Sequence, residues 1–189
     1  MLLKSCAFFL GLMMVSMGSS SARAEAVDPQ AAYQYAQTIL SQALSNPYLQ
    51  QLQYGPALAR IAELLPAQRF RVIYQGTAEY VNQCFGPSKV DGSRVQHSGF
   101  TELGGCYTGF NGGRPILSCP IAMCPSSLSQ DLGYAAHVII HEMGHVVHGT
   151  DECYASGIAI IAFRLAGLNG QLDAYTTPCH LDGLIAGPF

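Results

Sequence analysis

The chain has 189 residues and carries 9 basic and 12 acidic side chains, which gives a formal net charge of -3. Charged residues make up only 11% of the sequence, with no basic run, so a surface that follows a nucleic-acid backbone is excluded and no nucleic-acid partner is expected. Hydrophobic residues make up 49%, which excludes a chain that is disordered throughout.

Residues 1–24 have the three parts of a secretory signal. Lys4 supplies the positive start, an apolar run extends from Cys6 to Val15, and Ala22-Arg23-Ala24 is a small-residue cleavage motif. The apolar run is too short to span a bilayer. We therefore expect cleavage after Ala24, a secreted or periplasmic product without stable membrane association, and a single domain at 25–189.

The first elements of that domain are predicted from hydrophobic periodicity. Between Pro29 and Leu65 apolar residues recur at helical spacing, with a break at Asn46-Pro47, which predicts two helices. Arg69 to Tyr74 alternates polar with β-branched or aromatic residues and predicts a strand. A short helix is expected around Glu79 to Cys84, and the segment from Glu25 to Pro66 is a candidate to cover a cleft.

The segment from Phe85 to Pro125 is rich in Gly, Pro, Ser and Cys and predicts a module of small sheets and loops. Its clearest turn, Asn111-Gly112-Gly113, separates two candidate paired strands at 106–108 and 115–119. No internal repeat or low-complexity linker divides this segment from the rest of the chain. It is therefore expected to belong to the same domain.

Cysteine content predicts disulfides. The chain has seven cysteines, and loss of Cys6 with the signal leaves six: Cys84, Cys106, Cys119, Cys124, Cys153 and Cys179. An even set in a secreted chain indicates up to three disulfides, although sequence alone leaves about fifteen pairings open. A cysteine-rich zinc knot is the alternative, and an oxidising compartment disfavours it.

Two long helices are predicted towards the C-terminus. The first contains Leu132 to His148 and ends at Gly149, and its candidate caps are Ser126, Ser129 and Asp131. The second runs from about Asp151 to Leu168 and is expected to end at Asn169-Gly170. Helices combined with a small sheet indicate the α+β class.

The motif with the clearest chemistry is His141-Glu142-Met143-Gly144-His145, which lies inside the first of these helices. Residues four apart on a helix share a face, so His141 and His145 can bind one metal ion while Glu142 lies close enough to take a proton from a water on that ion. This pattern predicts a zinc hydrolase with Glu142 as general base. A chance match on a surface helix is the alternative interpretation.

A catalytic zinc site needs a third protein ligand and leaves the fourth position to water. Asp151 and Glu152 follow the histidine pair immediately after a turn, and both remain candidates for that ligand. His148 is a weaker candidate because it lies seven residues beyond His141 and faces only the open end of the helix. One zinc ion is expected.

Three elements of this stretch resemble, in order, the motifs of the aspzincins, the family of deuterolysin and the peptidyl-lysine metalloendopeptidases. They are His141-Glu142-Met143-Gly144-His145, Gly149-Thr150-Asp151-Glu152 and Leu172-Asp173-Ala174-Tyr175. The segment 116–120 also resembles the strand before the family's active-site helix. The resemblance covers roughly the last 75 residues. It implies a zincin-like fold with helices on a small sheet, and a monomeric zinc metalloendopeptidase that acts on proteins or peptides.

The resemblance also implies site residues. The family's third ligand is the Asp of its GTxD element, which corresponds to Glu152 when counted from Gly149 and to Asp151 when counted back from Tyr154. Asp151 keeps the family's residue type. From the downstream element, the resemblance implies that Asp173 orients His145 or another ligand. Neither a metzincin pattern, which lacks its Met-turn here, nor a gluzincin-like E-x-x-A pattern accounts for the downstream element.

The oxyanion of the reaction needs a donor besides the metal, and a tyrosine hydroxyl is a common solution. Tyr107, Tyr154 and Tyr175 are the candidates, and the sequence does not rank them; Tyr175 is the one that belongs to the downstream element of the resemblance. Two other functions stay open: a zinc amidase that acts on peptidoglycan, and a secreted, disulfide-bonded protein with a structural metal and no catalysis. A structural ion would have four protein ligands, which distinguishes the last case.

Overall fold

A computed structural model describes residues 26–87, 94–102, 105–111 and 114–185. The predicted signal at 1–24 and the turn glycines at 112–113 lie outside these ranges. The longer helices are α1 (Pro29–Leu44), α2 (Gly55–Leu64), α5 (Leu132–His148) and α6 (Glu152–Leu165), and the shorter ones are α3 (Ala78–Gln83), α4 (Pro125–Leu128) and α7 (Asp182–Ile185). The strands are β1 (Arg69–Val72), β2 (Phe85–Pro87), β3 (Arg94–Gln96), β4 (Gly99–Thr101), β5 (Tyr107–Asn111), β6 (Arg114–Ser118) and β7 (Pro120–Met123).

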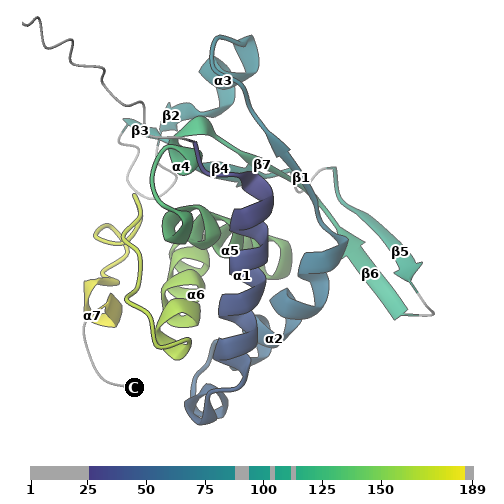
Figure 1. The fold of residues 1–189 in the computed structure, drawn as a ribbon, viewed down its shortest axis with the longest axis vertical. Helices are drawn as coiled ribbons and strands as arrows, with labels where there is room; N and C mark the ends of the chain where they lie inside the picture. The colour runs from purple at the N-terminus through teal and green to yellow at the C-terminus, as the bar shows by residue number, and fades with distance from the viewer. Residues whose placement is uncertain (1–25, 88–93, 103–104, 112–113, 186–189) are drawn as a thin grey trace, which may run out of the picture.

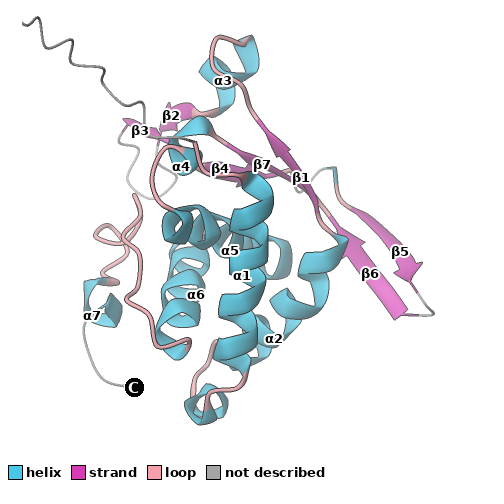
Figure 2. Cartoon of the chain, viewed as in Figure 1, coloured by secondary structure: helices cyan, strands magenta, loops and turns pink. Residues whose placement is uncertain are grey.

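The long helices gather on one side of a small sheet, so the described chain is mixed α+β as expected (Figures 1 and 2). The sheet has three strands in the order β1-β7-β4. Strand β7 pairs in parallel with β1, where Phe70 faces Ile121, and antiparallel with β4, where Phe100 faces Ala122. Strand β7 is therefore the central strand, and its Ile121 and Ala122 are fully buried.

The predicted hairpin is confirmed. Strands β5 and β6 pair antiparallel from Tyr107 opposite Ser118 to Asn111 opposite Arg114, and they extend away from the helices (Figure 2). A second two-stranded sheet, β2 with β3, was not expected. The parallel pairing of β1 with β7 was not expected either, because it joins segments about 50 residues apart that no turn connects.

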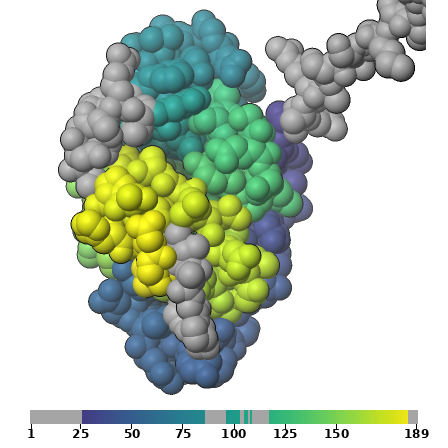
Figure 3. Space-filling model, turned by 90° about the vertical axis from the view of Figure 1, so that its left-hand side faces the viewer, coloured from purple at the N-terminus to yellow at the C-terminus, as the bar shows by residue number. Residues whose placement is uncertain are grey.

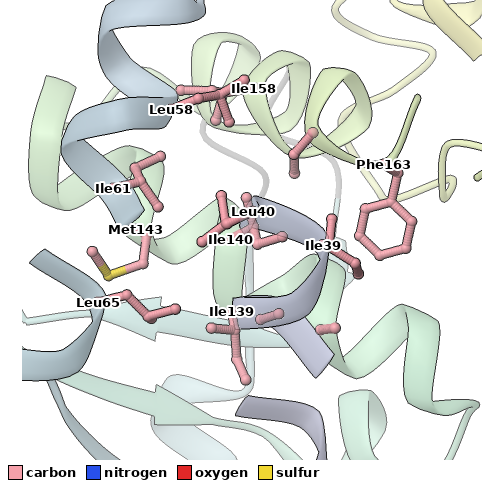
Figure 4. Close-up of a cluster of buried hydrophobic side chains, with 14 of the residues drawn as sticks. Ile39, Leu40, Leu58, Ile61, Leu65, Ile139, Ile140, Met143, Ile158 and Phe163 are labelled. Carbon is pink, nitrogen blue, oxygen red and sulfur yellow. The ribbon is translucent and has the colours of Figure 1, made fainter. Parts of the chain in front are cut away.

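The core lies between the helices (Figure 4). Side chains from α1, α2, α5 and α6 meet there, and the largest fully buried ones include Ile39, Leu40, Leu58, Ile61, Ile139, Ile140 and Phe163. These positions follow the helical periodicity of the sequence. No helix among the described residues is long and apolar enough to cross a membrane.

Three disulfides pair the six cysteines that remain after the predicted signal: Cys84–Cys124, Cys106–Cys119 and Cys153–Cys179. The first two hold the strand-rich segment together. The third ties the C-terminal segment to the first turn of α6. Disulfides of this number are typical of an oxidising compartment.

Helices α5 and α6 pack closely against each other, and specific residues cap or terminate α5 and allow the close approach. Asp131 is the N-cap of α5, and the helix ends at Gly149. Gly149 has a φ of 87°, a backbone conformation that would be strained in a residue with a side chain. A Cβ on Gly144 would lie 2.9 Å from the backbone Cα of Ala155, so glycine is needed for the close approach of the two helices. The expected end of α6 was wrong: the helix stops at Leu165 before Gly167, which also has a positive φ.

Candidate metal centre

Helix α5 places His141 and His145 one turn apart on its buried inner face. The two rings are centred 5.0 Å apart at an angle of 77°, and the side chains are 7% and 5% exposed. His145 Nδ1 lies 2.7 Å from the backbone oxygen of Gly149. A carbonyl oxygen only accepts, so Nδ1 donates and Nε2 of the neutral ring keeps its lone pair for a ligand.

Glu152 joins this pair because the chain reverses direction at Gly149. The first residue of α6 therefore faces the inner side of α5, and Glu152 is 6% exposed. Its Oε2 lies 3.2 Å from Nε2 of His141 and 3.2 Å from Nε2 of His145. The three side chains offer ligand atoms that all lie within 4.8 Å of one another. Two imidazoles and a carboxylate are a donor set that suits zinc.

Asp151, the alternative third ligand, caps a helix instead of facing the imidazoles. It is the N-cap of α6, where Oδ1 accepts a hydrogen bond of 2.9 Å from the backbone N–H of Tyr154, and the residue is exposed. The geometry therefore favours Glu152 as the third ligand. Asp151, which has the residue type of the aspzincin ligand, does not contact the two imidazoles. His148 is also outside the group, because its exposed ring stacks on Tyr154 with centroids 3.8 Å apart.

Charge is strongly coupled within the group. Burial lowers the pKa of His141, but hydrogen bonds with Asp173 and Glu152 outweigh burial and raise that pKa to about 10. Burial raises the pKa of Glu152, and the hydrogen bonds with His141 and His145 outweigh it, so this pKa lies well below its usual range. Without metal, the group holds an ionised carboxylate against a protonated imidazole. A divalent cation would take the place of that proton.

Glu142 lies beside the group and is 3% exposed. The hydroxyl of Thr101, on the edge strand β4, lies 2.8 Å from Glu142 Oε2 and 2.9 Å from the Glu142 backbone oxygen. A Cβ on Gly99 would come within 3.2 Å of Glu142 Oε1. Strand β4 thus fixes this carboxylate from one side, at the place where a general base is expected.

Asp173 contacts His141 and not His145. Its Oδ2 lies 3.5 Å from His141 Nδ1, 3.0 Å from His137 Nε2 and 2.7 Å from the Ser156 hydroxyl. Burial raises the pKa of Asp173. The hydrogen bonds with His137 and His141 outweigh burial and lower this pKa well below its usual range. Of the two options given by the sequence, Asp173 is therefore placed to orient His141.

Tyr175 is the candidate tyrosine that reaches the group. It is 7% exposed, and its ring stacks on His141 with centroids 5.8 Å apart and an angle of 18°. Tyr154 instead packs between His148 and Tyr54 and does not line the site. The side chain of Tyr107 lies outside the described residues.

These residues open into a cleft of about 350 Å³. Its described lining includes His141, Glu142, His145, Glu152, Asp173 and Tyr175, together with uncharged groups from Gln83, Gln96, Ser98, Phe100 and Tyr134. The C-terminal segment that carries Asp173 and Tyr175 is drawn in yellow on the surface in Figure 3. Figure 1 shows the elements that frame the cleft: α5, α6, β4 and this segment.

Glu102 lies near the cleft but is already paired. Its carboxylate forms an ion pair with Arg71, which also pairs with Glu79 and lies over the ring of Phe100 at 5.7 Å. The acidic residues in the described lining are the three that belong to the site: Glu142, Glu152 and Asp173. The described part of the cleft therefore offers no separate carboxylate for a lysine side chain.

The chain matches no family model, no curated protein and no solved structure.

Sequence reasoning missed three residues at the site. His137 precedes His141 by one helical turn, so the row of three histidines on α5 was visible in the sequence. Ser156 follows Glu152 by one turn of α6, which was also a readable signal. Thr101 gave no signal, because its position depends on the pairing of β4 with β7.

Proposed function

We propose that this protein is a secreted zinc metalloendopeptidase, in which His141, His145 and Glu152 hold one zinc ion and Glu142 is the general base. One observation carries the proposal: two imidazole Nε2 atoms and a carboxylate oxygen converge in a cleft next to a second carboxylate. The aspzincin resemblance of the sequence supports the same reaction. Glu152 as third ligand would be a departure from that family's aspartate.

Catalysis is favoured over a structural metal by the number of ligands. Within the described ranges, the ligand-forming group at this place contains three residues. His148 stacks elsewhere, and all six cysteines after the predicted signal are in disulfides. A position open to the cleft is what a catalytic zinc site keeps for water and substrate.

The zinc ion would supply the electrophile that polarises the scissile carbonyl and activates the attacking water. Glu142 takes the proton of that water and delivers it to the leaving amine. Thr101 holds the Glu142 carboxylate toward the cleft during both transfers. Tyr175, stacked beside His141, is the donor for the oxyanion that develops on the carbonyl oxygen.

The cleft also bears on the substrate. Apart from its histidines and the carboxylates of Glu142, Glu152 and Asp173, its described lining consists of neutral groups, among them amides, hydroxyls and the rings of Phe100 and Tyr134. Side chains without charge fit such a surface better than lysine, whose ammonium would lose water without gaining a carboxylate beyond the three of the site. We infer a preference for peptides with neutral side chains beside the scissile bond.

The proposal is tested on the mature chain from Glu25. Purified protein is expected to contain about one zinc per chain, to degrade denatured casein, and to lose this activity with a chelator and regain it with zinc. Parallel incubation with peptidoglycan separates the amidase from the peptidase. Zinc-loaded protein that cleaves neither substrate would favour the non-catalytic alternative.

A further inference from the structure

We propose that Ser156, Asp173 and His137 form a support network that fixes the ring of His141, with Ser156 as the link between ligand and carboxylate. This inference rests on the proposed metal site and adds two positioning residues, Ser156 and His137, to it. The three members come from separate segments: α6, the C-terminal segment and α5.

Ser156 is fully buried, and the geometry gives its hydroxyl two defined roles. Oγ donates to Asp173 Oδ2 at 2.7 Å and lies 3.2 Å from His141 Nδ1. A hydroxyl has one proton, and here Asp173 accepts it, so Oγ must accept from the Nδ1–H of His141. The direct distance from His141 Nδ1 to Asp173 is 3.5 Å, longer than a good hydrogen bond. Ser156 therefore carries the main polar contact on that side of the ring.

Asp173 is held in place through both of its oxygens. Oδ2 accepts from Ser156 and His137, while Oδ1 accepts from the backbone N–H of Tyr175 at 2.9 Å and the hydroxyl of Thr176 at 3.1 Å. The disulfide Cys153–Cys179 ties the same segment to α6. With both oxygens occupied by these donors, Asp173 supports His141 from the Nδ1 side of the ring.

His137 anchors the far end of the network. It is fully buried, with Tyr134 stacked at 6.2 Å and Phe163 at 5.9 Å. Its Nε2 faces a carboxylate that only accepts, so Nε2 donates. Its buried Nδ1 has no hydrogen-bond partner among the described residues. Within the described part of the chain, the single polar contact of this ring is therefore the one to Asp173, which is consistent with a positioning role.

The consequence for the ligand is a fixed tautomer. Because Nδ1–H of His141 is committed to Ser156, the lone pair of the neutral ring lies on Nε2, beside Glu152 and His145. Loss of the Ser156 hydroxyl leaves the buried Nδ1–H with only the longer contact to Asp173, at 3.5 Å, and so weakens the restraint on the ring. Removal of such an outer partner typically weakens metal binding about 10–100-fold.

The test compares Ser156→Ala with a matched control, Ser127→Ala. Ser127 is also fully buried and also donates one hydrogen bond, at 2.8 Å to the backbone oxygen of Cys124, but it lies in α4 and does not line the cleft. Zinc dissociation constants are measured by competition with a chromophoric chelator, and Co²⁺-substituted protein is compared by its visible absorption. We expect Ser156→Ala to bind zinc about 10–100-fold more weakly with an altered Co²⁺ spectrum, and Ser127→Ala to stay within about twofold of wild type.

A second pair of variants keeps the proposal testable if Ser156→Ala fails to fold. His137→Gln retains an N–H donor toward Asp173 and is expected to bind zinc more tightly than His137→Leu, which retains none. Unchanged zinc affinity and spectrum in Ser156→Ala, or equal affinity in the two His137 variants, overturns the support network while the zinc site stands. Absence of zinc binding by wild type overturns the proposed function and the network together.

Discussion

Two carboxylates, the buried Glu152 and the partly buried Asp173, lie on opposite sides of the His141 ring and make different contacts there. Glu152 meets Nε2 of His141 and Nε2 of His145 and lines the cleft. Asp173 lies on the Nδ1 side, where hydroxyl, imidazole and backbone donors satisfy both oxygens. The ring nitrogen that a carboxylate faces therefore separates a candidate ligand from a support.

The difference has its origin in how each carboxylate is delivered. Glu152 stands on the first turn of α6, directly against the inner face of α5. Asp173 lies in a turn in which the backbone N–H of Tyr175 and the hydroxyl of Thr176 both donate to its Oδ1. Only Oδ2 therefore faces His141 and its neighbours. Four experiments test these assignments.

Glu142→Gln should have the largest effect on hydrolysis, because we propose Glu142 as the general base and neither as a ligand nor as a support of His141. We expect peptide hydrolysis to fall about 10²–10⁴-fold, while zinc content stays near wild type. Hydrolysis rates on a quenched fluorescent peptide and zinc analysis of the same preparation are measured. Wild-type activity in this variant would remove the general-base role.

Glu152→Gln and Asp151→Asn separate the two neighbouring carboxylates. We expect Glu152→Gln to weaken zinc binding by more than about 100-fold, beyond the loss typical of a supporting residue. Asp151→Asn should bind zinc like wild type, because Asn is an equally good helix N-cap. Chelator competition provides both dissociation constants. The reverse order would return the third ligand to Asp151.

Zinc affinity should depend on pH because the metal competes with the proton on His141, whose pKa is about 10 without metal. Below that pH, each bound zinc displaces this proton, so we expect the apparent dissociation constant to fall by about a factor of ten per pH unit. The raised pKa also stabilises the metal-free fold. That contribution is complete below about pH 6.5, the value of an unperturbed histidine, and is lost as the pH rises through about 10.

These pH effects are measured by zinc titration and by denaturant unfolding of metal-free protein at several pH values. The support network predicts that Asp173→Asn reduces both, since Asp173 contributes to the raised pKa of His141. A zinc affinity independent of pH would mean that no proton is displaced from the imidazoles.

Thr101→Val should have the smallest effect of the four. The substitution removes the hydroxyl that contacts Glu142 and keeps a β-branched side chain on β4. We expect kcat to fall about tenfold, at the lower end of what a misplaced general base costs, with zinc affinity unchanged. A loss of zinc instead of kcat would show that Thr101 supports the metal group and not the base.

The sequence predicted the histidine pair of this site and left the third ligand open between two carboxylates. The i, i+4 spacing was enough to bring His141 and His145 together, because an α-helix has only one geometry. The choice between Asp151 and Glu152 depends on which of them caps α6. Asp is a preferred N-cap residue, so the sequence could have assigned Asp151 to the cap of α6, where it accepts from the N–H of Tyr154. The comparison with the family's spacing drew attention away from this assignment.

The remainder depends on long-range pairing that a single sequence does not encode in local patterns. Helices and the β5–β6 hairpin follow from periodicity and a turn, whereas β4 reaches Glu142 only because it pairs with β7. The C-terminal segment is the same kind of case. The Cys153–Cys179 disulfide ties it to α6, and this bond is one of many possible pairings of the cysteines.

An anomalous diffraction map of crystals of the chain from Glu25 onward, grown with zinc, tests the central claim most directly. We expect one zinc peak at bonding distance, about 2.0–2.2 Å, from Nε2 of His141, Nε2 of His145 and a carboxylate oxygen of Glu152, with its remaining side open to the cleft. A peak between His137 and Asp173, a fourth protein ligand, or no peak at all would contradict it.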